Sequence, residues 1–127
     1  MKEAQKLEKL RAAAESVCRQ WQKILRLEDW DIQVDIRSSV DMRLTNSLAT
    51  VERFGRKRRA HIELLDPREF RQADNTGDLD VESSIVHELL HIYTQPMMRK
   101  CPKDSELEAE EQAIHAISMA LLKAARR

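Results

Sequence analysis

The sequence predicts an α+β fold, in which one small sheet packs against three helices. Apolar residues recur at steps of three and four near the start of the chain and in its last third, whereas residues 30–36 alternate strictly between apolar and polar. The chain has 127 residues with two glycines and three prolines, so we expect a single domain over residues 1–127.

Residues 3–27 are expected to form the first helix. Its apolar stripe has members at alternating helical steps: Leu7, Leu10, Ala14, Val17, Trp21 and Ile24. Such a stripe fits a helix laid across a sheet or another helix, and it also fits a short coiled-coil seam in a dimer. The first arrangement is the common one, so we expect a monomer.

Three strands are predicted next. The run "WDIQVDI" (30–36) alternates as a half-buried strand does. The runs "SLATVERF" (47–54) and "RRAHIEL" (58–64) flank "GRK", so Gly55 is expected to supply a hairpin turn. We therefore expect a three-stranded antiparallel sheet, with a loop over 37–46 and with strand 58–64 as an edge that pairs with an extended peptide.

Two further helices are predicted after a loop over 66–78. The first runs from about residue 80 to 95, with Asp78 or Asp80 as its N-cap, and ends before Pro96. Its apolar residues surround the helix, so it should be buried. The last helix covers about 105–125 and begins at Asp104 or Ser105.

The composition limits the classes of function. The formal net charge is zero, which gives no reason to expect a polyanionic partner, and no stretch of the sequence is apolar enough to span a membrane. The first residues are charged and lack the apolar region of a signal peptide. Cys18 and Cys101 are expected to be reduced thiols, as in a cytoplasmic protein.

The predicted second helix contains the run "IVHELLHIY" (85–93). His87 and His91 lie one helical turn apart and point the same way, so both can reach one metal ion. Glu88 is rotated by about 100° from His87 and can stand beside that ion as a general base. The alternative is a core helix with two satisfied histidines, but burying a charged glutamate there is costly, which favours the metal site. This is the HExxH arrangement of zinc metallopeptidases.

A catalytic zinc site needs a third protein ligand. The metzincin continuation would require glycine and histidine at Thr94 and Met97, which excludes that family. A carboxylate from the following helix remains, and the run "SELEAEEQAIHAI" supplies four: Glu106, Glu108, Glu110 and Glu111.

At this point the chain resembles the gluzincin peptidases. Their third ligand is a glutamate about twenty residues past the second histidine, which implies Glu111 here, with Glu108 and Glu110 as alternatives. The family has a supporting aspartate four residues further on, where this chain has His115. Together "WDIQV", "HIELLDP", "SSIVHELLHIYTQPM" and "EEQAIHAI" also resemble small metallopeptidases encoded by phages and prophages. The resemblance implies a minimal zincin-like domain, with an HExxH active-site helix, a C-terminal ligand helix and one Zn²⁺ per chain.

Some further residues have two interpretations. Tyr93 and His115 are candidates for stabilising an oxyanion, although Tyr93 also continues an apolar stripe. The basic run "RFGRKRR" (53–59) could contact phosphates, but no aromatic residues interleave with its charges, so we expect a solvated turn and no nucleic acid partner. His61 is expected on the surface, and Cys101 without a metal role.

The sequence therefore predicts a zinc-dependent metallopeptidase that acts on a peptide or protein. The alternative is a zinc-stabilised regulatory module that binds DNA or protein without catalysis.

Overall fold

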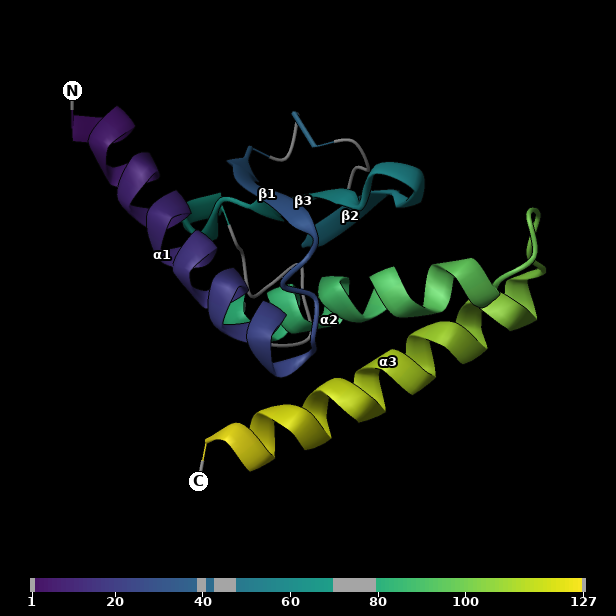
Figure 1. The fold of residues 1–127 in the computed structure, drawn as a ribbon. Helices are drawn as coiled ribbons and strands as arrows, with labels where there is room; N and C mark the ends of the chain where they lie inside the picture. Colours follow the sequence, from purple (N-terminus) through teal and green to yellow (C-terminus); the bar gives the residue numbers. More distant parts are fainter. Residues whose placement is uncertain (1, 39–40, 43–47, 70–79, 127) are drawn as a thin grey trace.

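A three-stranded sheet lies over a layer of helices in the computed structural model of the chain (Figure 1). The structure describes residues 2–38, 41–42, 48–69 and 80–126. Its elements follow the order α1 (Lys2–Ile24), β1 (Asp31–Arg37), β2 (Ala49–Phe54), β3 (Arg59–Leu65), α2 (Val81–Thr94) and α3 (Asp104–Ala125). Short 3₁₀ turns occur at Gly55–Lys57, Pro67–Glu69 and Gln95–Met97. The predicted α+β class and the order of the elements are confirmed.

The sheet is mixed, so the prediction of an antiparallel sheet is wrong. β2 and β3 form the expected antiparallel hairpin, but β1 pairs with the other edge of β3 and runs parallel to it. The alternation of β1 holds, since Ile32, Val34 and Ile36 are buried. Alternation identifies the buried face of a strand, but it carries no information on the strand's neighbour or direction.

The central position of β3 corrects a second prediction. Both edges of this strand (58–64 in the sequence prediction) are already paired, to β1 and to β2. It therefore has no open edge to offer a peptide. β2 is the outer strand on the side of the sheet that contacts α2.

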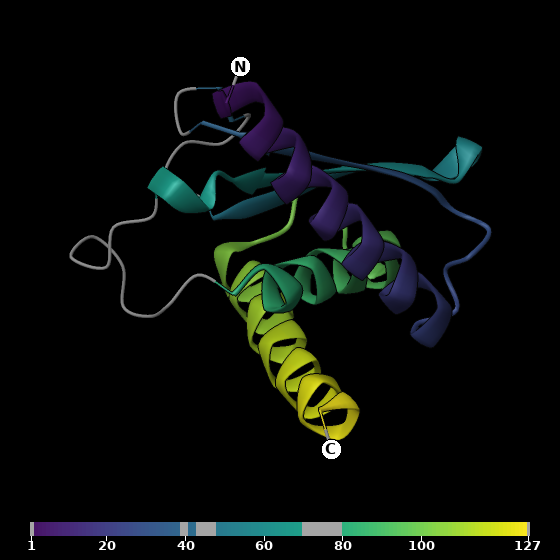
Figure 2. The ribbon, with the colours of Figure 1, turned by 90° about the vertical axis from the view of Figure 1, so that its left-hand side faces the viewer.

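α1 and α2 cover the apolar face of the sheet, and Figure 2 shows α1 crossing in front of the strands and α2 below them. Trp21 from α1 and Leu89 from α2 are almost completely buried, as is Ile62 from β3. The predicted stripe of α1 packs against this core, with its last member Ile24 exposed. The stripe thus packs within its own chain.

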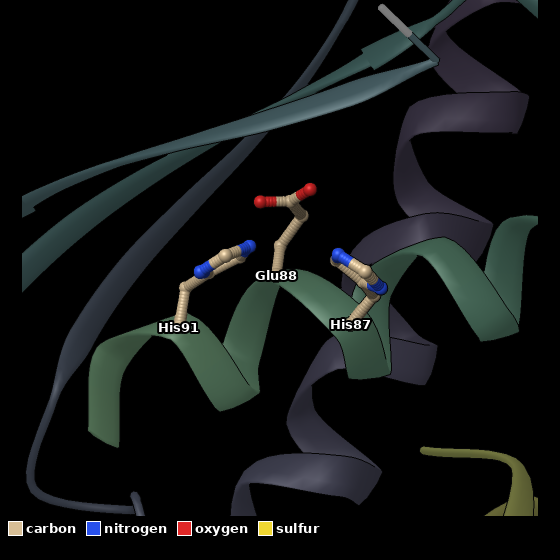
Figure 3. Close-up of side chains that lie close together, drawn as sticks. All are labelled: His87, Glu88 and His91. Carbon is tan, nitrogen blue, oxygen red and sulfur yellow. The ribbon is translucent and has the colours of Figure 1, made fainter. Parts of the chain in front are cut away.

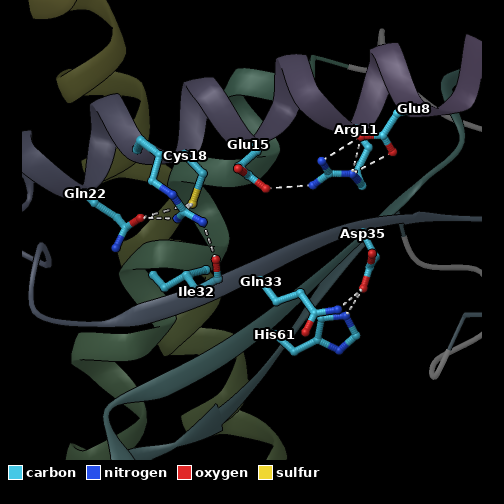
Figure 4. A network of polar contacts seen from close by, with 10 residues as sticks. Glu8, Arg11, Glu15, Cys18, Gln22, Ile32, Gln33, Asp35 and His61 are labelled. Carbon is cyan, nitrogen blue, oxygen red and sulfur yellow. Dashed lines mark hydrogen bonds and ion pairs between the residues drawn. The ribbon is translucent and has the colours of Figure 1, made fainter.

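Polar contacts fix the end of α1 against β1. The Gln22 amide donates to the carbonyl oxygens of Leu27 and Trp30 at 3.0 and 2.9 Å, and the Arg19 guanidinium donates to that of Ile32 at 2.7 Å. Figure 4 shows Gln22 and the bond to Ile32 beneath α1, together with His61 and Asp35, which are 2.7 Å apart on the opposite face of the sheet. His61 is partly exposed there, as expected.

α3 packs along α2 and is tied to it at its C-terminal end. Arg126 reaches the carboxylates of Asp80 and Glu82 at 3.0 and 2.8 Å, and Glu82 also accepts a hydrogen bond of 2.8 Å from the Trp21 indole. Asp80 is the N-cap of α2, as one of the two predicted positions. α3 begins with Lys103 as its N-cap, one residue before the expected start. No helix in the described part of the chain is long and apolar enough to cross a membrane.

Candidate metal centre

The two histidines of the HExxH run lie on the side of α2 that faces β2 and α3. His91 is 9% exposed, Glu88 is 6% exposed, and the side chain of His87 is 26% exposed. The imidazole rings lie with their centroids 5.1 Å apart. Figure 3 shows the Glu88 carboxylate projecting between them, towards the strands. Ligand atoms of these three side chains lie within 4.8 Å of one another.

Glu111 of α3 joins the two imidazoles. One of its carboxylate oxygens lies 2.8 Å from Nε2 of His87, and the other lies 3.0 Å from Nε2 of His91. The family resemblance implied this residue as the third ligand, and the structure brings it to the same nitrogen of each ring. Its side chain is 53% exposed, so the group opens to solvent on one side.

Glu110 approaches the same centre from the opposite side of His91. Its carboxylate lies 3.0 Å from Nδ1 of His91 and accepts a hydrogen bond of 2.6 Å from the Thr94 hydroxyl. Its side chain is only 8% exposed. Glu110 therefore contacts the far nitrogen of the ring, whereas Glu111 contacts the near one. Thr94, three residues after His91 on the same helix, was not identified from the sequence.

The other candidate residues lie elsewhere. Glu108 is exposed and accepts a hydrogen bond from Gln112 at 3.4 Å, so it does not join the cluster. Tyr93 donates its hydroxyl hydrogen to the carbonyl oxygens of Leu25 and Arg26, on the far side of α2. This contact fixes the end of α1 and takes Tyr93 away from the histidines.

His115 is exposed on α3, one turn beyond Glu111. It is close enough to His87 to affect that residue electrostatically. The pKa of His87 lies below its usual value, chiefly because the ring is partly buried; Glu111 opposes this shift, and His91 and His115 add to it. His87 is therefore neutral at pH 7, which is the form that binds a metal ion.

A cleft of about 550 Å³ opens over the histidines. Leu48 and residues 49–51 of β2 form one wall. The opposite wall comes from α2 and from three residues of α3: Leu107, Glu110 and Glu111. No lysine or arginine from the described ranges lines it. The cleft thus combines a strand edge, two imidazole rings and three carboxylates.

Comparison with known proteins adds no family to these observations. No family model, no curated protein and no solved structure matches the chain. The function must therefore be argued from the site.

Proposed function

We propose that the chain is a zinc metallopeptidase of the HExxH type. The observation that carries the proposal is the position of Glu111, whose two oxygens lie 2.8 and 3.0 Å from the Nε2 atoms of His87 and His91. Two imidazoles and one carboxylate are the ligand set of the zinc peptidases that use a glutamate from a later helix. Glu88, the expected general base, lies between the two rings.

The two contacts of Glu111 are close to the spacing that zinc requires. Tetrahedral zinc with bonds of about 2.0–2.1 Å holds its ligand atoms about 3.3 Å apart. The separations between Glu111 and the two histidines are a few tenths of an ångström shorter than this. Small side-chain movements would therefore admit the ion.

Glu110 supports this geometry as an orienting group. With a metal ion at Nε2, the ring hydrogen of His91 would sit on Nδ1, where the Glu110 carboxylate, 3.0 Å away, would accept it. The lone pair of Nε2 is then directed at the metal position. Metal-binding histidines usually have such a partner on their other nitrogen. The expected family aspartate is replaced by His115, and Glu110 supplies a carboxylate from a different position.

Glu88 is placed to move the proton during hydrolysis. Bound zinc supplies a positive charge that lowers the pKa of a nearby water and polarises the peptide carbonyl. Glu88 would accept a proton from that water as it attacks the carbonyl carbon. It would then deliver the proton to the nitrogen of the departing amine. Its burial between the strands and the rings keeps bulk water from competing for the same proton.

The substrate class suggested by the cleft is an extended peptide. The outer edge of β2 borders the histidines, and a peptide can add to such an edge through backbone hydrogen bonds. Because those bonds involve the backbone alone, they place little restriction on the substrate sequence. The open cleft agrees with weak side-chain selection.

The second candidate is a zinc-stabilised binding or regulatory module without catalysis. It is favoured by one observation: neither expected oxyanion group lines the cleft, since Tyr93 faces α1 and His115 is exposed beyond it. An enzyme of this fold would then have to stabilise the oxyanion by the metal alone or by backbone groups.

One experiment with the Glu88→Gln variant distinguishes the peptidase from the non-catalytic module. Zinc content would be measured on the purified protein, and hydrolysis would be followed on a mixed peptide library by mass spectrometry. The enzyme requires cleavage by the zinc-loaded parent, and loss of cleavage in Glu88→Gln with zinc retained. A zinc-loaded parent that cleaves nothing would favour the module, and a parent that binds no zinc would reject both.

A further inference from the structure

The basic run 53–59 is not used by the metal centre, and the structure gives it an environment that the sequence did not reveal. The turn after α1 and the tip of the β2–β3 hairpin lie at the same end of the sheet, on the right in Figure 2. Between them is a concavity of about 450 Å³. Trp30 and Tyr93 line it, from segments far away in the sequence. Trp30 and Tyr93 thus give the basic run aromatic neighbours in space.

Three arginines face this concavity: Arg26, Arg53 and Arg58. Arg53 lies over the Trp30 ring, with its guanidinium carbon 5.1 Å from the ring centroid, and donates to the carbonyl oxygen of Ile92 at 3.2 Å. Gly55 makes room for it, because a methyl group there would collide with the guanidinium. A guanidinium stacked on an indole leaves its remaining N–H groups free to bind an anion in the ring plane.

Arg26 and Arg58 share an uncommon backbone conformation. Their φ angles are 62° and 51°, and no other residue in the described ranges that is not glycine has a positive φ. Left-handed backbone costs about 1–2 kcal/mol for such residues. Both strained arginines line the one concavity, and residues held in such conformations cluster at functional sites.

The local charge is strongly positive although the chain is neutral as a whole. The concavity contains three arginines and one acid, Asp29, which pairs with Arg58. The hairpin tip adds Arg56 and Lys57, which are both exposed. Acidic residues gather instead around the metal cleft, at Glu88, Glu110 and Glu111. The chain is therefore polarised, and a zero net charge does not exclude a polyanionic partner at this end.

We propose that this surface, made of Arg26, Trp30, Arg53, Arg58 and Tyr93 with the hairpin tip 56–57, binds single-stranded nucleic acid. The arginines and Lys57 would contact phosphates. Tyr93 is 46% exposed, and its ring would stack on a base. A duplex keeps its bases stacked on one another, so it would use only the charges. The proposal does not depend on the peptidase activity.

The test is fluorescence anisotropy with labelled thymidine and uridine oligonucleotides of about 12 nucleotides, a length within the usual site size. The parent is expected to bind at least one of them, and more tightly than a duplex of equal length. Arg56→Gln/Lys57→Gln should weaken binding and reduce the slope of log affinity against log salt by about 1.4, or about 0.7 for each lost phosphate contact. Lys9→Gln/Lys123→Gln, which removes two exposed charges on α1 and α3, is the matched control and should bind as the parent does.

The stacking contribution is tested at Tyr93. Tyr93→Leu should lose about tenfold in affinity, whereas Tyr93→Phe keeps the ring, loses only the bond to α1 and should bind as the parent does. Failure of both oligonucleotides to bind at low salt would overturn the proposal. Equal binding of the duplex, equal weakening by the Lys9/Lys123 control, or equal competition by polyglutamate would also overturn it, by showing charge attraction alone.

Discussion

α2 and α3 are held together at both ends by charged groups, but the two ends differ in what closes them. At the C-terminal end of α3, Arg126 forms ion pairs with both Asp80 and Glu82, and the Trp21 indole donates a further hydrogen bond to Glu82. At the other end, Glu110 and Glu111 contact His87 and His91. The pKa of His87 is lowered, which favours its neutral form. One end contains a permanent cation, while the other collects carboxylates around two imidazole rings.

This difference separates a structural ion pair from a binding site. A cluster of acids without a permanent cation is destabilised by repulsion unless a cation or protons join it. The Arg126 end has no such need. The comparison predicts that metal should matter greatly at the histidine end, and that pH should matter at the Arg126 end.

The largest expected effect is on zinc affinity when a ligand is removed. Zinc binding should weaken by more than about 100-fold in each of three variants: His87→Ala, His91→Ala and Glu111→Ala. About 100-fold is the upper limit for losing a residue that only hydrogen-bonds to a ligand. Competition with a chromophoric chelator would measure this. Glu108→Ala, on the same helix but bonded to Gln112, should bind zinc as the parent does. Parent-like affinity in Glu111→Ala would refute its role as a ligand.

Metal removal should next destabilise the fold, because the ion joins α2 to α3. At a free zinc concentration about 100 times the Kd, binding contributes about 2.7 kcal/mol. The melting temperature of the zinc-loaded protein should therefore fall by roughly 5–15 °C on chelation. Scanning calorimetry would show it, and His91→Ala should not respond to the chelator. If chelation left the melting temperature of the zinc-loaded parent unchanged, zinc would not join α2 to α3.

A smaller effect is expected at Glu110, which contacts His91 from behind. Glu110→Ala should weaken zinc binding by about 10–100-fold, while Glu110→Gln, which retains an acceptor for Nδ1, should lose less. The same chelator competition applies. If Glu110→Ala lost as much affinity as Glu111→Ala and Glu110→Gln recovered none of it, Glu110 would be a ligand instead of an orienting group.

The smallest effect concerns acid stability at the Arg126 end. The Trp21 hydrogen bond and Arg126 lower the pKa of Glu82 below its usual value of 4.5. Because the folded state favours the charged form, this contribution is complete above pH 4.5 and is lost as the pH falls through the lower folded pKa.

Glu82→Gln should therefore cost about 1 kcal/mol of unfolding free energy at pH 7, and less as the pH falls below about 4. Urea unfolding at a series of pH values would measure the difference. Glu28→Gln, at an exposed position, is the control. A deficit in Glu82→Gln that is the same at all pH values would show that its charge is not involved.

The sequence predicted the helices and strands better than it predicted which of them lie side by side. The spacing of His87 and His91 defines their common face, because helix geometry is local, and the position of Glu111 followed from the family resemblance. The parallel pairing of β1 could not be predicted, since no local pattern records which strand lies beside it. The same limit hid the contact between Thr94 and Glu110, and the meeting of Trp30 with Arg53, which are distant in sequence.

The two cysteines offer a practical consequence of the way the core is packed. Cys18 is completely buried, and burial raises the pKa of its thiol to about 11, so it should resist alkylation. Cys101 is exposed in the connection between α2 and α3, the two helices that carry the proposed metal ligands. A maleimide dye should therefore attach at Cys101 alone. The natural sequence already provides a fluorescent reporter position between these two helices, without any substitution.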